Sequence, residues 1–213
     1  MQLCVTREQT QGKGQHGRHW ESQRDGSILF SIRRYFQQEC NLNGLSLVIG
    51  LAIVKVLEKE CLVEGFKIKW PNDIYFEDKK LAGILLENQM QSKNQSVVIG
   101  VGINYALDQN MVCKIPWIDL AKITKTLPDI KLLTAEIINN ILVMSDHFSA
   151  FGFDDFKSDW KRYDMLQGKR VKITDIEESF EGEVVGVSSK GALKIFTKDG
   201  VKELYSSRHI EYI

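Results

Sequence analysis

The residues whose types could do chemistry gather first in a glycine-rich segment near the start of the 213-residue chain. Residues 12–18 read Gly-Lys-Gly-Gln-His-Gly-Arg, and Trp20 follows two positions later. Three glycines let backbone N–H groups approach an anion closely. Lys13 and Arg18 add cations that could hold phosphate or carboxylate oxygens, and the flat face of Trp20 could stack on a ring such as adenine. The segment is therefore a candidate anion-binding loop.

Two known nucleotide-binding motifs look like this segment but do not fit it. The G-x-G-x-x-G motif of dinucleotide folds needs a helix that opens at the loop, whereas here a turn signal at 25–26 leads into a strand-like run at 27–33. A P-loop would need a lysine where Arg18 stands. A solvated surface turn with incidental charges remains the plain alternative, because short glycine motifs often occur without function.

A second group of candidate residues lies between positions 69 and 104. The run Lys-Trp-Pro-Asn-Asp at 69–73 places Asp73 after a short strand, where it could bind Mg²⁺ or orient a cation; an Asx-type turn is the alternative. Lys80 precedes an apolar strand, so it could be a fixed positive charge that stabilises negative charge developing on a substrate. The alternative is a solvated lysine in a hairpin. Gly83 and the run Gly-Val-Gly-Ile-Asn at 100–104 suggest a close approach by a ligand, or a bulge and a strongly twisted strand.

Apolar patterns predict the elements that position these groups. Strands are expected at residues 3–5, 27–33, 66–70, 81–87 and 97–104. A polar turn at 77–79 lies just ahead of the strand at 81–87, so the pair around that turn is expected to form a hairpin. A buried helix is expected at 44–60 because that run is apolar on nearly all sides. A second helix is expected at 134–148 with Thr134 as its N-cap, and more helix at 151–165, broken near Gly152.

The last segment changes character, and we place a domain boundary near Leu166. Short β-type runs at 171–174, 180–187, 192–196 and 201–205 are separated by turn signals at 189–191 and 199–200. This pattern is typical of a small, strongly bent β-barrel of SH3-like size. The predicted domains are therefore residues 1–166 and residues 167–213.

Composition narrows the class of protein. The formal net charge is zero and the hydrophobic share is 43%, so no global field recruits nucleic acid or an acidic membrane. The four cysteines form no C-x-x-C pair, which fits a reduced setting without a zinc site. The most apolar run is too short to span a bilayer. We therefore expect a cytoplasmic protein with no nucleic-acid or membrane partner.

The order of these motifs resembles the biotin–protein ligase family. It comprises the glycine loop with Gln9 ahead of it and Trp20 behind it, then K-W-P-N-D at 69–73, K-L-A-G-I at 80–84 and G-x-G-I-N at 100–104. The resemblance covers nearly the whole chain, and it implies an α+β fold: a mixed sheet flanked by helices, followed by an SH3-like barrel. It also implies that biotin and Mg²⁺-ATP form biotinyl-5′-AMP. A lysine on a biotin carboxyl carrier protein, a subunit of acetyl-CoA carboxylase, then accepts the biotin.

The resemblance also implies roles for individual residues. Lys80 and Arg18 are the expected catalytic residues, and Asp73 is the expected Mg²⁺ ligand. The expected biotin-binding residues are Gln9, Gly12, Lys13, Gly14, Gln15, Lys80 and Gly83. The expected nucleotide-binding residues are Lys13, Arg18, Trp20, Asn72, Asp73 and Asn104. A homodimer through sheet edges is a further expectation.

The chain also departs from the family pattern. The family motif usually reads G-R-G-R, whereas Lys13 and Gln15 stand here, and the neutral Gln15 suggests easier release of biotinyl-AMP. The family places a strand and helix with a Ser-Thr-Asn motif before the loop, so we expect a chain truncated at its N-terminus, without the DNA-binding domain that some members have. A non-catalytic or impaired paralogue that binds nucleotide or carrier is one alternative, and a lipoate ligase or octanoyltransferase is another.

Overall fold

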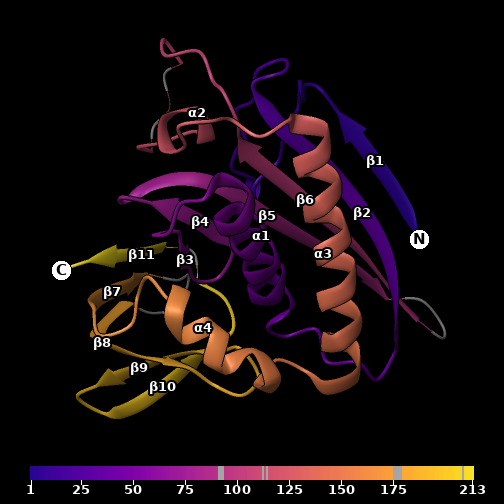
Figure 1. Ribbon diagram of the computed structural model, residues 1–213. Coiled ribbons are helices and arrows are strands. Elements are labelled where there is room, and N and C mark those ends of the chain that lie inside the picture. Colours follow the sequence, from indigo (N-terminus) through magenta and orange to yellow (C-terminus); the bar gives the residue numbers. More distant parts are fainter. Residues whose placement is uncertain (91–93, 112, 114, 175–178, 208) are drawn as a thin grey trace.

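The larger part of the molecule is built on one six-stranded sheet (Figure 1). The computed structural model describes residues 1–213 except 91–93, 112, 114, 175–178 and 208. The strands lie in the order β1-β2-β6-β5-β4-β3. Their bounds are β1 Gln2–Thr6, β2 Ser27–Gln37, β3 Lys67–Lys69, β4 Asp73–Phe76, β5 Lys79–Met90 and β6 Asn94–Asn104. Neighbouring strands pair antiparallel, and the parallel contacts found in the described part are isolated bridges, Ile68 to Asp164 and Lys80 to Trp117.

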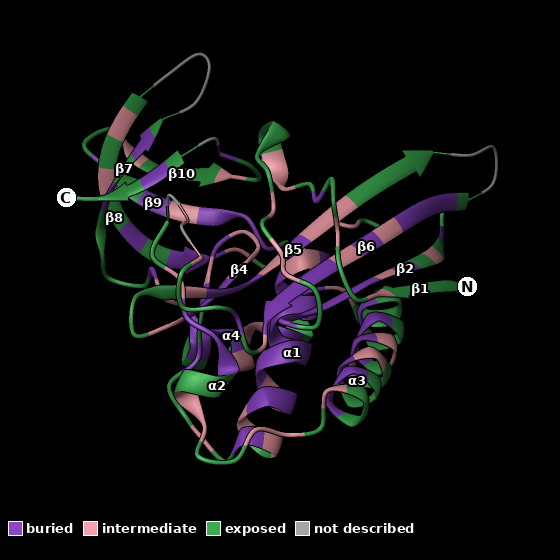
Figure 2. Ribbon diagram, turned by 90° about the horizontal axis from the view of Figure 1, so that it is seen from above, coloured by how far each residue is buried: buried purple, intermediate pink, exposed green. Residues whose placement is uncertain are grey.

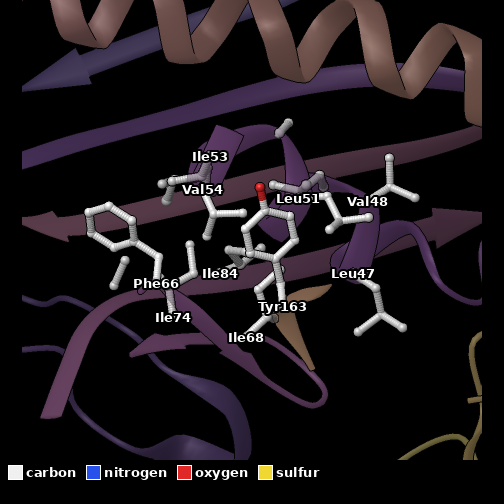
Figure 3. Close-up of a cluster of buried hydrophobic side chains, with 14 of the residues drawn as sticks. Leu47, Val48, Leu51, Ile53, Val54, Phe66, Ile68, Ile74, Ile84 and Tyr163 are labelled. Atoms are coloured by element: carbon white, nitrogen blue, oxygen red, sulfur yellow. The ribbon is translucent and has the colours of Figure 1, made fainter. Parts of the chain in front are cut away.

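Helix α1, Leu45–Cys61, is the centre of the core. Its sequence is apolar on nearly every side, so it is buried along most of its length (Figure 2). It packs against β3, β4, β5 and the second long helix. Figure 3 shows Leu51 and Val54 of α1 near Ile84 of β5, with the ring of Tyr163, the last residue of helix α4 (Lys157–Tyr163), in the same cluster. The predicted buried helix is thus confirmed.

The second long helix, α3, runs from Ile130 to Phe151 and begins one turn earlier than expected. Asp129 is its N-cap, because its carboxylate accepts hydrogen bonds from the backbone N–H groups of Lys131 and Leu132. The prediction of Thr134 as N-cap was wrong: this residue lies inside the helix, and its hydroxyl donates to the carbonyl of Ile130 at 2.5 Å. Sequence preference alone does not separate the two residues, since both types cap helices well.

Shorter helices complete the first part. They are α2 Leu120–Ile123, α4 Lys157–Tyr163 and two single 3₁₀ turns, Gln15–Gly17 and Asp154–Phe156. The predicted break near Gly152 is confirmed, because α3 ends there with a glycine at φ 76°. Within the described ranges, we find no helix that is both long and apolar enough to cross a membrane.

The C-terminal residues form a separate five-stranded sheet in the order β10-β9-β8-β7-β11. Its strands are β7 Arg170–Thr174, β8 Ser179–Val187, β9 Leu193–Thr197, β10 Gly200–Leu204 and β11 His209–Tyr212. The four predicted strands are confirmed in this SH3-like fold, and β11 was missed. The run His-Ile-Glu-Tyr at 209–212 does alternate, but it is only four residues long and only Ile210 is buried, so it is a short signal for a strand.

The two parts are joined by contacts between residues far apart in sequence. The buried indole of Trp70 donates from Nε1 to the carbonyl of Gly191 at 3.1 Å. Gly191 has φ 76°, and a Cβ added there would lie 2.6 Å from the Cα of Gly44 at the start of α1. Only glycine permits both this conformation and this approach. The C-terminal sheet is therefore seated tightly against the N-terminal end of α1.

Candidate functional site

The glycine loop folds into a short closed hairpin. The N–H of Trp20 donates to the carbonyl of Gly12 at 3.0 Å, and the N–H of Gly14 donates to the carbonyl of Arg18 at 2.8 Å. A Cβ at Gly12 would lie 2.4 Å from the carbonyl oxygen of Trp20, so the closure depends on glycine. At the tip, His16 and Gly17 have φ 57° and 73°. The loop is thus an ordered structure with both ends fixed.

Trp20 turns its indole onto a floor made of glycines. Gly83 of β5 and Gly102 of β6 are direct cross-strand partners. A Cβ at Gly83 would lie 3.0 Å from the ring, and one at Gly102 would lie 2.6 Å from it. The two glycines therefore let a flat ring lie directly against the backbone of the sheet. The indole Nε1 is buried and has no hydrogen-bond partner.

Lys80 and Asp73 form an ion pair beside this floor. The ammonium Nζ of Lys80 lies 2.8 Å from Oδ1 of Asp73, and both side chains are about one-fifth exposed. The β4–β5 ladder pairs Tyr75 with Lys80 and Ile74 with Ala82, leaving Leu81 as an extra residue between them. This bulge turns Lys80 toward the face that holds Asp73 and Gly83, since cross-strand partners share one face. Lys80 also lies 5.6 Å from the centre of the Trp20 ring.

Positive charge is concentrated around this pair. Burial lowers the pKa of Lys69, and the charges of Lys80 and Arg18 lower it further, while Asp73 opposes the shift. Burial also raises the pKa of Tyr75, next to Asp73, so its phenol stays neutral. An anionic ligand would relieve the repulsion among these cations, because opposite charges at close range favour each other's charged forms.

Two cavities adjoin each other along the glycine loop. The smaller, about 270 Å³, is lined by the loop, Asp73, Lys80 and the glycine floor. The larger, about 910 Å³, lies between the loop, the start of α1 and residues 205–207 of the C-terminal sheet. Lys13, Gly14, Gln15 and Arg18 line both. Ligand sites in proteins usually occupy about 300–1,000 Å³, so the two cavities together have room for a ligand with two parts.

The structure places most of the predicted site residues around these cavities. The lining includes Gln9, Gly12, Lys13, Gly14, Gln15, Arg18, Trp20, Asn72, Asp73, Lys80 and Gly83. The side chain of Asn72 donates to the carbonyl of Ile84 at 2.7 Å. Asn104 lies apart from the cavities, is 5% exposed and donates to the carbonyls of Lys80 and Ile118.

Several lining residues were missed at the level of sequence. Ser31, Leu85, Glu87 and Val98 line the smaller cavity. Residues 83, 85 and 87 alternate along β5 on the face that Gly83 marks, so strand periodicity could have found Leu85 and Glu87. The larger cavity is also lined by residues 43, 44, 46 and 47 and by residues 205–207, and no local signal in the sequence brings those segments together.

The residues present fit a metal ion only in a limited way. In the described part of the chain, no cluster of three or more His, Cys, Asp or Glu side chains could hold a metal. Asp73 offers one carboxylate, already paired with Lys80. Mg²⁺ commonly binds through one or two carboxylates together with substrate phosphates and water. The site therefore suits Mg²⁺ that arrives with a nucleotide rather than a resident ion.

Comparisons with known proteins agree on one family. The biotin/lipoate A/B protein ligase family matches residues 1–104, and the biotin protein ligase C-terminal domain matches residues 167–208. A solved biotin protein ligase from Aquifex aeolicus, in complex with biotin and ATP, superimposes with a TM-score of 0.82 at 30% identity. That match covers 99% of this chain and 89% of the other.

Longer relatives are also similar. The bifunctional ligase/repressor BirA of Salmonella typhimurium is 34% identical over 202 residues, covering 93% of this chain and 62% of that protein. The BirA of Bacillus subtilis is 29% identical over 213 residues, covering 96% of this chain and 64% of that protein. The chain thus spans less than two thirds of the length of these relatives.

Proposed function

This chain belongs to the biotin protein ligase family, and from that premise we propose that it is an ATP-dependent biotin–protein ligase. In the first step a carboxylate oxygen of biotin attacks the α-phosphorus of ATP. The bond between that phosphorus and the bridging oxygen breaks, and pyrophosphate leaves biotinyl-5′-AMP behind. In the second step the ε-amine of a carrier lysine attacks the acyl carbon. AMP leaves with its oxygen, and the amine loses a proton as the amide forms.

The observation that carries this proposal is the Lys80–Asp73 pair beside the glycine floor. The first step joins two anions, so its transition state needs fixed positive charge. The ammonium of Lys80 is held 2.8 Å from Asp73 and is about one-fifth exposed, which keeps it oriented and partly shielded from water. In this proposal Lys80 binds oxygens of the biotin carboxylate and of the α-phosphate, and Arg18 binds the phosphates. Removing one such stabilising group from an enzyme typically slows it about 10²–10³-fold.

The remaining predicted residues take supporting roles in the proposal. Gln9, Gly12, Lys13, Gly14 and Gln15 bound the biotin and phosphate side of the loop. Gly83 lines the smaller cavity on the biotin side, beside the ring of Trp20 that packs on it. Trp20 provides an aromatic surface near the adenine. The nucleotide side includes Asn72, Asp73 and Asn104, the last acting through the backbone of Lys80, to which it donates at 3.3 Å.

Mg²⁺ completes the set of cations in this proposal. Asp73 would hold it together with the phosphates of ATP, and when bound it would supply charge neutralisation at those phosphates. Lys80, whose Nζ lies 2.8 Å from Oδ1 of Asp73, would add a second positive charge beside that carboxylate. We also propose that Gln15, which is neutral where the family has arginine, weakens retention of biotinyl-AMP.

The wider setting follows from the same premise. We propose the biotin carboxyl carrier protein as the acceptor, a cytoplasmic location, and no nucleic-acid partner because the net charge is zero. A homodimer is proposed through β1, an edge strand whose Leu3 and Val5 are 48% and 56% exposed. Open strand edges are ready to pair with another strand. Sedimentation of the purified chain over a range of concentrations tests the dimer.

The decisive experiment combines carrier labelling with pyrophosphate release. The chain is incubated with biotin, Mg-ATP and a biotin carrier domain, and the carrier is probed with streptavidin. Lys80→Ala is expected to lose at least about 10²-fold of both pyrophosphate release and labelling, and Lys80→Arg to recover part of it because the charge remains. Lipoate replaces biotin in a parallel reaction.

The control is Lys79→Ala, which removes an exposed neighbouring lysine. Equal loss in both variants would remove Lys80 from the reaction, and faster pyrophosphate release with lipoate than with biotin would reassign the substrate. No activity in the parent chain, with the fold intact, would contradict the ligase proposal for this chain.

A further inference from the structure

The tip of the glycine loop touches the C-terminal sheet. Nε2 of His16 lies 3.2 Å from the carbonyl oxygen of Ser207, a residue 191 positions away in the sequence. A carbonyl can only accept, so Nε2 must be the protonated nitrogen of the ring. His16 reaches this position in a left-handed conformation, φ 57° and ψ 34°, which is uncommon for a residue other than glycine. A contact that holds a residue in such a conformation offsets its strain.

Ser207, which accepts this contact, is buried and lies next to a sheet that packs on the first part of the molecule. It is 7% exposed and lies between β10 and β11. The sheet around it is tied to the first part of the molecule by the Trp70–Gly191 hydrogen bond at 3.1 Å. A second tie runs from Nζ of Lys69 to the carbonyl of Ile210 at 3.3 Å. The sheet next to Ser207 is therefore held to the first part of the molecule by contacts outside the loop.

The loop that His16 holds separates the two cavities. Its base is fixed by Trp20 on the glycine floor, and its middle residues line both the 270 Å³ and the 910 Å³ cavity. Residues 205–207 line the larger cavity together with His16 and Gly17 of the loop tip. A displacement of the loop tip away from residues 205–207 would therefore break the contact between His16 and Ser207.

We propose that His16 is a positioning residue that latches the glycine loop to the C-terminal sheet and thereby retains the activated acyl-adenylate. This inference rests on the proposed ligase function. It adds a role for the C-terminal part of the chain, which provides the carbonyl acceptor that holds the loop. The loop stays closed after pyrophosphate has formed, and it opens when the carrier lysine enters. The side-chain hydrogen bond of His16 is to Ser207 and not to the Lys80–Asp73 pair, so the first step is expected to proceed without it.

Proteolysis tests the latch without any need for activity. Trypsin cleaves after Lys13 and Arg18, and intact-mass spectrometry follows those two nicks in the folded chain. His16→Ala is expected to raise both nicking rates about twofold to tenfold, the factor for one lost hydrogen bond. His16→Asn is the matched control, because asparagine accepts the left-handed conformation but is too short to reach Ser207. His16→Gln keeps a side-chain N–H donor without adding a tryptic site, and it is expected to restore protection.

The outcomes separate contact from backbone conformation. Fast nicking of both the Ala and the Asn variant supports the latch. If only the His16→Ala variant is nicked fast, the effect comes from the left-handed backbone conformation, and the proposal is overturned. Nicking of His16→Ala at the parental rate also overturns it. His147→Ala, a change on α3 far along the chain, controls for general loosening, and its loop is expected to be cleaved at the parental rate.

Retention itself is measured by misdirected labelling. With biotin and Mg-ATP, His16→Ala is expected to release pyrophosphate at the parental initial rate and to biotinylate serum albumin, which has no carrier domain, about twofold to tenfold faster. Unchanged albumin labelling together with fast nicking would overturn the retention role. A fall in pyrophosphate release would place His16 in the chemistry and also overturn it. A parent chain that releases no pyrophosphate contradicts the ligase proposal, while the nicking comparison still decides the latch.

Discussion

Gly102 offers the most direct test of how the glycine floor receives Trp20. A Cβ at this position would lie 2.6 Å from Cε2 of the indole, 2.7 Å from Cζ2 and 2.7 Å from Nε1, and these are its three nearest atoms. Ordinary contacts between carbon atoms are about 3.5–4.0 Å. The Gly102→Ala substitution therefore requires the ring to move by about 1 Å or to leave the floor.

The expected magnitude combines two opposing effects. Overpacking of this kind costs about 1–3 kcal/mol of stability. Alanine regains about 0.5–1 kcal/mol over glycine in a strand, because glycine loses more conformational freedom on folding. The net loss is thus up to about 2.5 kcal/mol. For a chain of about 150–250 residues, 1 kcal/mol corresponds to a fall of about 2–4 °C in Tm.

A double-mutant cycle with Trp20→Ala isolates the clash. Free energies of unfolding are measured by urea denaturation for the parent, both single variants and the double variant. Without the indole, Gly102→Ala is expected to be neutral or to stabilise by up to about 1 kcal/mol, so the coupling energy is about 1–3 kcal/mol. Gly100→Ala is the matched control on the same strand, since its Cβ would meet Leu85 at an ordinary 3.6 Å.

Two results would refute this reasoning. If Gly102→Ala destabilises the Trp20→Ala protein as much as it destabilises the parent, the indole does not occupy the floor. If Gly102→Ala and Gly100→Ala have equal effects in the parent, the close approach to Trp20 has no energetic consequence. Either result would also remove the indole from the account of the ligand site.

Three further predictions concern the framework around the site. Asp129→Ala is expected to lower the free energy of unfolding by about 1 kcal/mol, because two backbone N–H groups of α3 lose their acceptor; an unchanged urea midpoint would contradict this. Burial raises the pKa of the Cys61 thiol to about 11, so only about a thousandth of it is thiolate at pH 8. Iodoacetamide at that pH is expected to modify the exposed Cys4 far faster, which peptide mapping measures, and comparable rates would disprove burial of Cys61. Gly191→Ala is expected to destabilise the chain by at least about 1–3 kcal/mol, because its Cβ would lie 2.6 Å from Gly44 and its φ is 76°; calorimetry showing an unchanged Tm would refute the tight seating of the C-terminal sheet.

The sequence by itself determined the elements whose pattern is local. The run at 44–60 is apolar on nearly all sides, which predicts a buried helix, and α1, Leu45–Cys61, is that helix. The apolar runs at 27–33, 81–87 and 97–104 predicted strands, and β2, β5 and β6 contain them and extend further. The glycine loop and the Lys-Trp-Pro-Asn-Asp run identified the family, because motifs in a given order along the chain are a property of sequence alone.

Tertiary structure decided whatever depends on partners distant in the chain. The side chain of Lys80 points to the same face as Asp73 because of the bulge at Leu81. One extra residue moves the following side chains to the other face of the sheet, and the amino-acid composition of the strand does not reveal it. The choice of Asp129 over Thr134 as N-cap depended on how far α3 extends, which is set by packing rather than by local preference. The contact of His16 with Ser207 joins residues 191 positions apart. No pattern within one segment encodes such a meeting, because it arises only when both parts of the chain have folded and docked.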